Sequence, residues 1–394
     1  RMLMLWSVFL PLGRMWSLDA RRARSAAGED TTLVSIGGTA LLAQMFLVYF
    51  MSGLFKCNPH WLSGEALYYA LSFEVYGRPL GAVLRQYPEM LALLTRATLV
   101  MELVAPWLLL VPWRNHMFRL AVMAAFLGLH LGIELTISVG LFSYVCAAGW
   151  LALVPTRFWE WRVGRAIAVP FTKLFGPPAG DCTKGAEQQS LGARIRDRLE
   201  LCGQGICLGL LLLMLAGNME NLNFFERGTV LPAAGQELTR RLNMHQKWAM
   251  FAGPLKNNFW FVARARLADG SSIDLLRRGE PIPETPVPGD VGDLPNHRWR
   301  KYFLNLKNDR YAVFREPLAH WLMERWNAAE PEERRVVQLD LVLIEQQIDY
   351  ASRQGEYTAR VLARIGEEQH EEAGNFAEAL RRLEADGGGL DPFP

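Results

Sequence analysis

Residues 31–64 read TTLVSIGGTALLAQMFLVYFMSGLFKCNPHWLSG, and the first 25 of them carry no charged side chain. A helix of about 20 apolar residues spans the hydrocarbon core of a bilayer, so this stretch is long enough to cross a membrane. Lys56 ends the stretch, directly before Asn-Pro-His-Trp. The sequence therefore predicts a membrane-spanning helix over 33–55 with a lysine directly after its C-terminal end.

Segments of the same kind recur through the first half of the chain and then stop. Beyond residue 223 no window is apolar enough to cross a bilayer. The 51% hydrophobic composition is therefore the average of a membrane half and a water-soluble half. The predicted spans are 33–55, 89–112, 117–138, 139–155 and 202–220, together with 1–13, which we expect to continue upstream of Arg1.

The second half has the patterns of a small soluble domain. Apolar and polar residues alternate on both sides of Asp269-Gly270, which predicts a β-hairpin over 258–276. Residues 297–306 and 315–329 have the periodicity of amphipathic helices, and 334–348 alternates as a strand. The predicted fold is an all-α polytopic membrane domain (1–222), followed by a small α+β soluble domain (223–350) and a charged helical tail (351–394).

Basic residues are distributed unequally between the predicted loops. The loops 14–32, 113–116 and 156–201 contain thirteen arginines and lysines, whereas the loop 56–88 contains three. The positive-inside rule places the more basic loops in the cytoplasm. We therefore expect a bacterial-type plasma membrane protein with Lys56 and the C-terminal half on the outer side. Within 56–88, the aromatic-rich stretch 61–87 predicts a helix that lies at the interface or re-enters the bilayer.

Composition argues against several other classes of function. The net charge of +2 is too small to indicate a nucleic-acid partner, and no zinc finger, P-loop or RNA-binding signature is present. The five cysteines contain no C-x-x-C pair, so we expect neither a structural zinc site nor a disulfide framework.

Ionisable residues inside predicted spans are the first candidates for function, because a polar group in a bilayer is costly. They are Arg96, Glu102, His130 and Glu134. His130 and Glu134 are four residues apart, which places them on one face of a helix. They either line a functional site or act as a polar pair that fixes helix packing.

Lys56 has two interpretations at this stage. A lysine at the end of a span can extend its ammonium group to the lipid headgroups and serve only as an anchor. A lysine held in apolar surroundings loses part of its preference for the charged form, and a neutral amine can act as a base. Spacing in the sequence does not choose between the two.

Several motifs resemble the horizontally transferred transmembrane (HTTM) domain family, which includes the vitamin K-dependent gamma-glutamyl carboxylases. The resemblance covers roughly 1–160, and 245–270 is also similar to the soluble region that follows this domain in bacterial relatives. The motifs are WSLDA (16–20), QMFLVYFMSGLFKCNPHWLSGEALYY (44–69), HLGIELTISVGLFSY (130–144) and LVPTRFW (153–159).

The resemblance implies a carboxylase of the carbon–carbon lyase class. In such enzymes reduced vitamin K is deprotonated and reacts with oxygen, a strong base then removes a proton from the γ-carbon of a glutamate, and carbon dioxide adds there. The position of Lys56 matches the lysine that starts this chemistry. The implied cofactor is reduced vitamin K or menaquinone, and the implied substrate is a peptide or protein. The residues expected around the quinone are Trp16, Asp19, Trp61, His130, Glu134 and Tyr144.

One position departs from the carboxylase pattern. The carboxylases have a histidine two residues before the tryptophan of Trp-Ser-x-Asp, and Arg14 occupies that position here. A guanidinium group stays charged and cannot replace a titrating imidazole in proton transfer. The sequence therefore also allows a non-enzymatic membrane module that binds lipid or quinone, or that scaffolds a partner.

Overall fold

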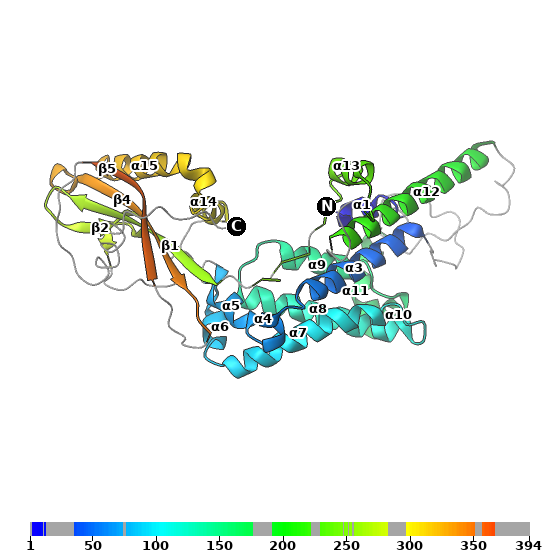
Figure 1. The fold of residues 1–394 in the computed structure, drawn as a ribbon. Helices are drawn as coiled ribbons and strands as arrows, with labels where there is room; N and C mark the ends of the chain where they lie inside the picture. Colours follow the sequence, from blue (N-terminus) through cyan, green and yellow to red (C-terminus); the bar gives the residue numbers. More distant parts are fainter. Residues whose placement is uncertain are drawn as a thin grey trace. The chain divides into compact units, whose positions relative to one another are not determined.

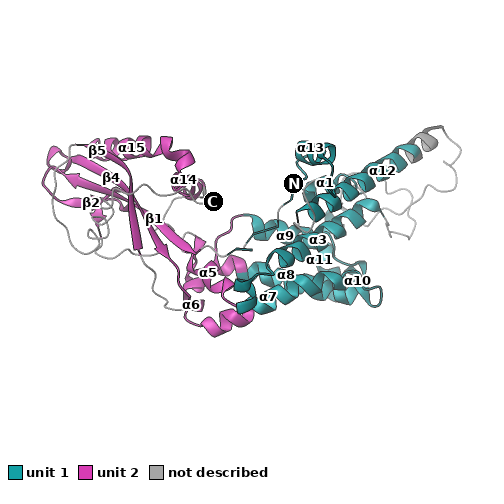
Figure 2. Ribbon diagram, viewed as in Figure 1, with its two compact units in different colours: residues 1–63, 95–132, 141–253 teal, residues 64–94, 133–140, 254–394 magenta. Residues whose placement is uncertain are grey.

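The computed structural model describes residues 2–10, 12, 35–73, 76–175, 191–221, 229–246, 248–250, 252–253, 256–282, 297–350 and 357–366. The chain forms two compact units, which are coloured separately in Figure 2. Unit 1 comprises residues 1–63, 95–132 and 141–253, and unit 2 comprises residues 64–94, 133–140 and 254–394. These units divide the chain differently from the predicted boundary at residue 222.

Four helices among the described residues are long and apolar enough to cross a membrane. They are α3 (Ile36–Phe55), α7 (Pro88–Leu108), α8 (Asn115–Thr136) and the Arg198–Glu220 part of α12 (Leu191–Glu220). They coincide closely with four of the predicted spans, so the chain has the apolar helices of a membrane protein.

The other two predicted spans are shorter in the structure. Residues 1–13 contain α1 (Met2–Ser7), and 139–155 contains α9 (Phe142–Leu151). The second helix begins late because Ile137 forms a β-bridge with Gly77 and Gly140 has a φ of 69°. The apolar sequence continues through Val154 to Pro155, but α9 ends at Leu151.

Helix α3 is the centre of unit 1. Its first turn is capped by Ser35, whose Oγ accepts a hydrogen bond from the Gly38 N–H at 3.0 Å. It ends at Phe55, and Pro59 begins the short helix α4 (Pro59–Ser63). The buried core combines side chains of α3 with those of α1, α8, α9 and α12, among them Trp6, Met45, Phe126, Trp150 and Met214. The remaining helices of unit 1 are α10 (Thr156–Glu160), α11 (Arg162–Phe175) and α13 (Ala233–Arg241).

Unit 2 is built on an antiparallel sheet with the strand order β3-β2-β1-β4-β5. The strands are β1 (Asn257–Leu267), β2 (Ser272–Asp274), β3 (Glu280–Pro281), β4 (Val336–Gln347) and β5 (Tyr357–Gly366). Helices α14 (His297–Leu306) and α15 (Arg315–Asn327) pack on one face (Figure 1). The predicted hairpin, both amphipathic helices and the strand over 334–348 are therefore present.

The sequence pattern explains the sheet only in part. Leu339, Leu341 and Leu343 pack with α14 and α15, as the alternation of β4 predicts. Val342 and Ile344 are also buried, in a second cluster on the other face of the sheet with Trp260, Val262 and Ala359. The centre of β4 is therefore apolar on both sides.

The prediction of a helical tail is wrong for residues 357–366, because these residues form β5. The strand pairs with β4 along its length. Arg364 Nε donates to Asp340 Oδ1 at 2.9 Å, and Arg264 Nη2 donates to Asp340 Oδ2 at 3.0 Å. A buried carboxylate between two arginines thus favours pairing of this charged segment with the sheet.

The region 56–88 also differs from the single interfacial helix predicted within it. It forms α4, then α5 (Ala66–Ser72) and α6 (Pro79–Leu84). Gly64 separates the first two with a φ of 95°. Phe73 follows α5 and is buried in the core of the sheet, where its ring lies 5.9 Å from that of Phe259. Residues 64–88 of this loop between two spans therefore belong to unit 2, whereas Lys56 and α4 belong to unit 1.

Candidate functional site

Lys56 is not an exposed anchor. Its Nζ donates to both carboxylate oxygens of Glu102, at 2.5 and 2.6 Å. The two side chains are only 6% and 4% exposed. Nζ also donates to Ser52 Oγ at 3.0 Å and lies 4.9 Å from the centre of the Trp61 ring. An amine, a carboxyl group and an aromatic face therefore meet in a site shielded from solvent.

The close approach of α3 and α7 creates this pair. A Cβ atom added at Gly53 would lie 3.0 Å from Leu103 Cδ2 and 3.2 Å from the Glu102 carbonyl carbon. A glycine at this position therefore lets the two helix backbones come close enough for Glu102 to reach the next turn of α3. Ser52 and Lys56 are four residues apart on that helix, so they face Glu102 together.

The loop after Lys56 is held in place by its own side chains. Asn58 Nδ2 donates to the Ala252 carbonyl oxygen at 2.6 Å. Trp61 is buried on α4, and its ring faces the amine. Arg96 of α7 donates to the carbonyl oxygens of Leu62 and Ser63 at the end of α4. The segment that follows the C-terminal end of α3 is therefore held by contacts with both Ala252 and α7.

A second polar group lies further along the same face of α3. Tyr49 Oη is 2.8 Å from His130 Nε2 and accepts a hydrogen bond from Trp150 Nε1 at 2.9 Å. The rings of Tyr49 and Phe126 are stacked, with centroids 3.7 Å apart. His130 Nδ1 and Ser143 Oγ are buried and have no hydrogen-bond partner among the described residues. Both atoms retain unused hydrogen-bonding capacity in the interior of unit 1.

Residues 1–158 match the family model of the HTTM domain. The match covers the first 158 of the 394 residues, and HTTM domain denotes this matched region. Neither the comparison with curated proteins nor the comparison with solved structures finds a match. The HTTM domain contains Lys56, Glu102, Tyr49 and His130, and it ends within LVPTRFW (153–159), before α11 begins.

The structure separates the site residues predicted for the HTTM domain. Lys56 and Trp61 lie together, whereas His130 belongs to the group around Tyr49. Glu134 is paired with Arg78 in unit 2. Tyr144 is 60% exposed on α9. Trp16, Asp19 and Arg14 lie outside the described residues.

The sequence singles out both Glu102 and Lys56 but does not indicate the contact between them. Glu102 stood out as a charge within a span, yet Lys56 is 46 residues away on another helix. Tyr49 and Ser52 were missed. Their spacing from Lys56 follows one face of a helix, and that spacing is the signal that could have found them.

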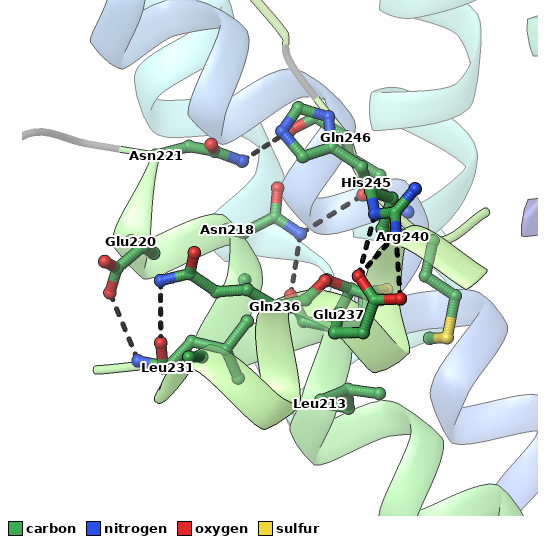
Figure 3. Close-up of a pocket in the computed structure, with 15 residues that line it drawn as sticks. Leu213, Asn218, Glu220, Asn221, Leu231, Gln236, Glu237, Arg240, His245 and Gln246 are labelled. Carbon is green, nitrogen blue, oxygen red and sulfur yellow. Dashed lines mark hydrogen bonds and ion pairs between the residues drawn. The ribbon is translucent and has the colours of Figure 1, made fainter. Parts of the chain in front are cut away.

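Outside the HTTM domain, a cavity of about 610 Å³ lies beside α12 and α13 (Figure 3). Apolar walls come from Leu213, Leu231 and Met244, and amide side chains come from Asn218, Gln236 and Gln246. Its amides are already paired: Asn218 Nδ2 donates to Gln246 Oε1 at 3.1 Å, and Gln246 Nε2 donates to Gln44 Oε1 at 2.9 Å. These bonds tie α12 to α3.

No metal centre is apparent within the described ranges. They contain no group of three or more His, Cys, Asp or Glu side chains placed to hold a metal ion.

Proposed function

We propose that this protein is an integral membrane enzyme related to the gamma-glutamyl carboxylases, in which Lys56 Nζ accepts a hydroxyl proton from a reduced quinone. The reaction is then an oxygen-dependent carboxylation of a glutamate-like peptide or protein substrate. The supporting observation is the burial of the Lys56 amine against Glu102. A lysine that only anchors a helix extends its ammonium group to water or headgroups instead. Amines in dry sites are the ones that serve as bases.

The residues around Lys56 fit a reduced quinone, either reduced vitamin K or menaquinone. Such a molecule has a hydroxylated aromatic ring and an apolar tail. Lys56 and Trp61 would hold the ring, since one offers a base and the other an aromatic face. When bound, the quinol supplies the reaction with oxygen and the strong base that takes the γ-proton of glutamate. The chain itself supplies the proton acceptor, shielding from water and the orientation of the ring.

The experiment compares Lys56→Arg with wild type for quinol epoxide formation by the full chain in lipid nanodiscs. Reduced vitamin K and menaquinone are each supplied with oxygen and bicarbonate, with and without a glutamate peptide. Arginine keeps the positive charge but does not give up its proton, so we expect a loss of about 10²-fold or more. Lys173→Arg is the matched control, because Lys173 is exposed on α11. Equal rates for Lys56→Arg and wild type would remove Lys56 from the mechanism.

A non-enzymatic membrane module is the second candidate, and one observation favours it. Glu102 and Ser52 already accept hydrogen bonds from Lys56, so the pair can serve simply to join α3 to α7. Absence of epoxide from wild type with every quinone would support this candidate. Extraction of the purified protein then shows whether it retains a lipid or quinone.

A further inference from the structure

Lys56 can act as a base only after it has lost a proton, and Glu102 is the group in hydrogen-bond contact that can take it. We propose that Glu102 takes the ammonium proton of Lys56, so that the pair converts between a charged form and a populated neutral form without exchanging a proton with water. The inference deepens the proposed function and rests on it for its catalytic consequence. Glu102 is then a positioning residue that acts through Lys56.

The geometry of the pair allows this transfer. Both Glu102 oxygens lie within 2.6 Å of Nζ, so a proton can move along an existing hydrogen bond. The positions of Nζ and the two carboxyl oxygens are compatible with both the charged pair and the neutral pair, because they do not determine where the proton lies. The side chains are 6% and 4% exposed, and burial disfavours the charged form of each group. Conversion to an amine and a carboxylic acid removes both buried charges at once.

Among the residues that the structure describes, the side chains in printed contact with the Lys56 amine other than Glu102 are uncharged. Ser52 Oγ and the Trp61 ring, which touch Lys56, are neutral, and the neighbouring Cys57 thiol donates to the Gly53 carbonyl oxygen. Two further titratable side chains of unit 1 are Tyr49, two turns before Lys56 on α3, and His130 of α8. These two are hydrogen-bonded to each other. Within the described part of the chain, Lys56 and Glu102 are the two groups placed to share the proton.

The proposed step balances in protons and charge. One Nζ–H bond breaks and one O–H bond forms on Glu102, which leaves a lone pair on Nζ. With a quinol bound, Nζ would take its hydroxyl proton, so that an N–H bond would form, an O–H bond would break and the negative charge would stay on the quinol oxygen. Lys56 would then be an ammonium and Glu102 would remain protonated. Neither proton transfer changes an oxidation state.

The first test reads the position of the proton without any substrate. Infrared spectra of the full chain in nanodiscs are compared for wild type, Glu102→Gln, Lys56→Arg and Lys56→Met. We expect the carbonyl stretch of a protonated carboxyl group in wild type and its loss in Glu102→Gln. Lys56→Arg should also lose it, since guanidinium retains its proton. Lys56→Met should keep it, because a lone buried carboxyl group is neutral. A wild type without this band, or a Lys56→Arg variant that keeps it, overturns the proposal.

The second test reads the catalytic consequence through a pH profile. Glu102→Gln should lower epoxide formation about 10²-fold near neutral pH, and its rate should rise with pH because Lys56 must now release its proton to water. Glu102→Asp should keep the shape of the wild-type profile. A rate loss with an unchanged profile would mark a purely structural role and overturn the proposal. If wild type makes no epoxide, the proposed function fails, and the infrared comparison still decides where the proton lies.

Discussion

Tyr49 Oη lies 2.8 Å from His130 Nε2, and the same hydroxyl accepts a hydrogen bond from Trp150. One phenol therefore joins α3, α8 and α9 inside the helical unit. Interhelical hydrogen bonds of this kind add to packing forces where lipid provides no hydrophobic drive for helix association. The phenol is a fixed point in the unit that also holds Lys56.

We expect Tyr49→Phe to lower the free energy of unfolding by about 1–2 kcal/mol, because it leaves two buried nitrogen atoms without a partner. Thermal unfolding in detergent measures the change. Tyr144→Phe is the matched control, because Tyr144 is 60% exposed and its hydroxyl contributes little. An equal shift in both variants would contradict the assignment of the Tyr49 hydrogen bonds to helix packing.

A double-mutant cycle tests the coupling of Lys56 and Glu102. Lys56→Met or Glu102→Leu alone leaves a buried polar partner unpaired, and we expect each to cost on the order of 3 kcal/mol. The double variant should recover most of that loss, because no unpaired group remains. Unfolding by denaturing detergent gives the three values, with Lys173→Met as an exposed control. Additive losses would show that the two side chains do not interact.

The β1–β2 hairpin should become more stable as the pH falls below neutral. Asp274 is buried, and burial raises the pKa of its carboxyl above the usual range despite hydrogen bonds from the Ala263 and Leu276 N–H groups. Since its folded pKa exceeds the unfolded value of about 3.9, the charged form destabilises the folded hairpin at neutral pH. That penalty is lost as the pH falls through the folded pKa.

Hydrogen exchange of the full chain, corrected for intrinsic rates, measures this effect in peptides from β1 and β2. Wild type should be better protected at about pH 4, close to the unfolded pKa, than at pH 7, whereas Asp274→Asn should show no such difference. Asp269→Asn serves as the control because Asp269 lies in the exposed turn of the same hairpin. A wild-type hairpin with equal protection at both pH values would refute the effect of burial.

The sidedness of the membrane domain depends on whether α9 and its flanks cross the bilayer. If they cross, the loop after α9 is cytoplasmic and the sheet lies outside, as the basic loops predict. Alkaline phosphatase fused after Pro394 should then be active in a bacterial host, and green fluorescent protein fused there should be dark. Reporters placed after His116 and after Glu160 should give the opposite pattern. A fluorescent C-terminal fusion would place the sheet in the cytoplasm.

Much of the fold could be predicted from the sequence because its causes are local. A bilayer imposes a length and a composition on each helix, and α3, α7, α8 and α12 meet both. Asp269-Gly270 predicts a hairpin because a tight turn needs a positive φ, which few residues adopt readily. Gly270 has a φ of 84°. The position of Lys56 at the C-terminal end of a span follows from the same local pattern.

The rest depends on contacts between distant residues. Spacing along α3 cannot reveal Glu102, because that carboxylate reaches Lys56 from another helix. The segment 357–366 has the charge of a solvated helix, and it becomes β5 because β4 offers an edge and Asp340 accepts Arg364. Glu134 lies one helical turn from His130 in sequence, yet its partner is Arg78.

The burial of Phe73 in the sheet has a consequence for biosynthesis. Phe73 is translated well before β1, which begins at Asn257, yet both belong to one apolar core. Chains generally fold from the N-terminus as they leave the ribosome. Here Phe73, in the loop between the first two long apolar helices, must wait for β1 and β4 before the core of the sheet can bury it. A chain truncated after α12 would have its long apolar helices, but Phe73 would have no core to enter, which would make the chain a target for chaperones and membrane proteases.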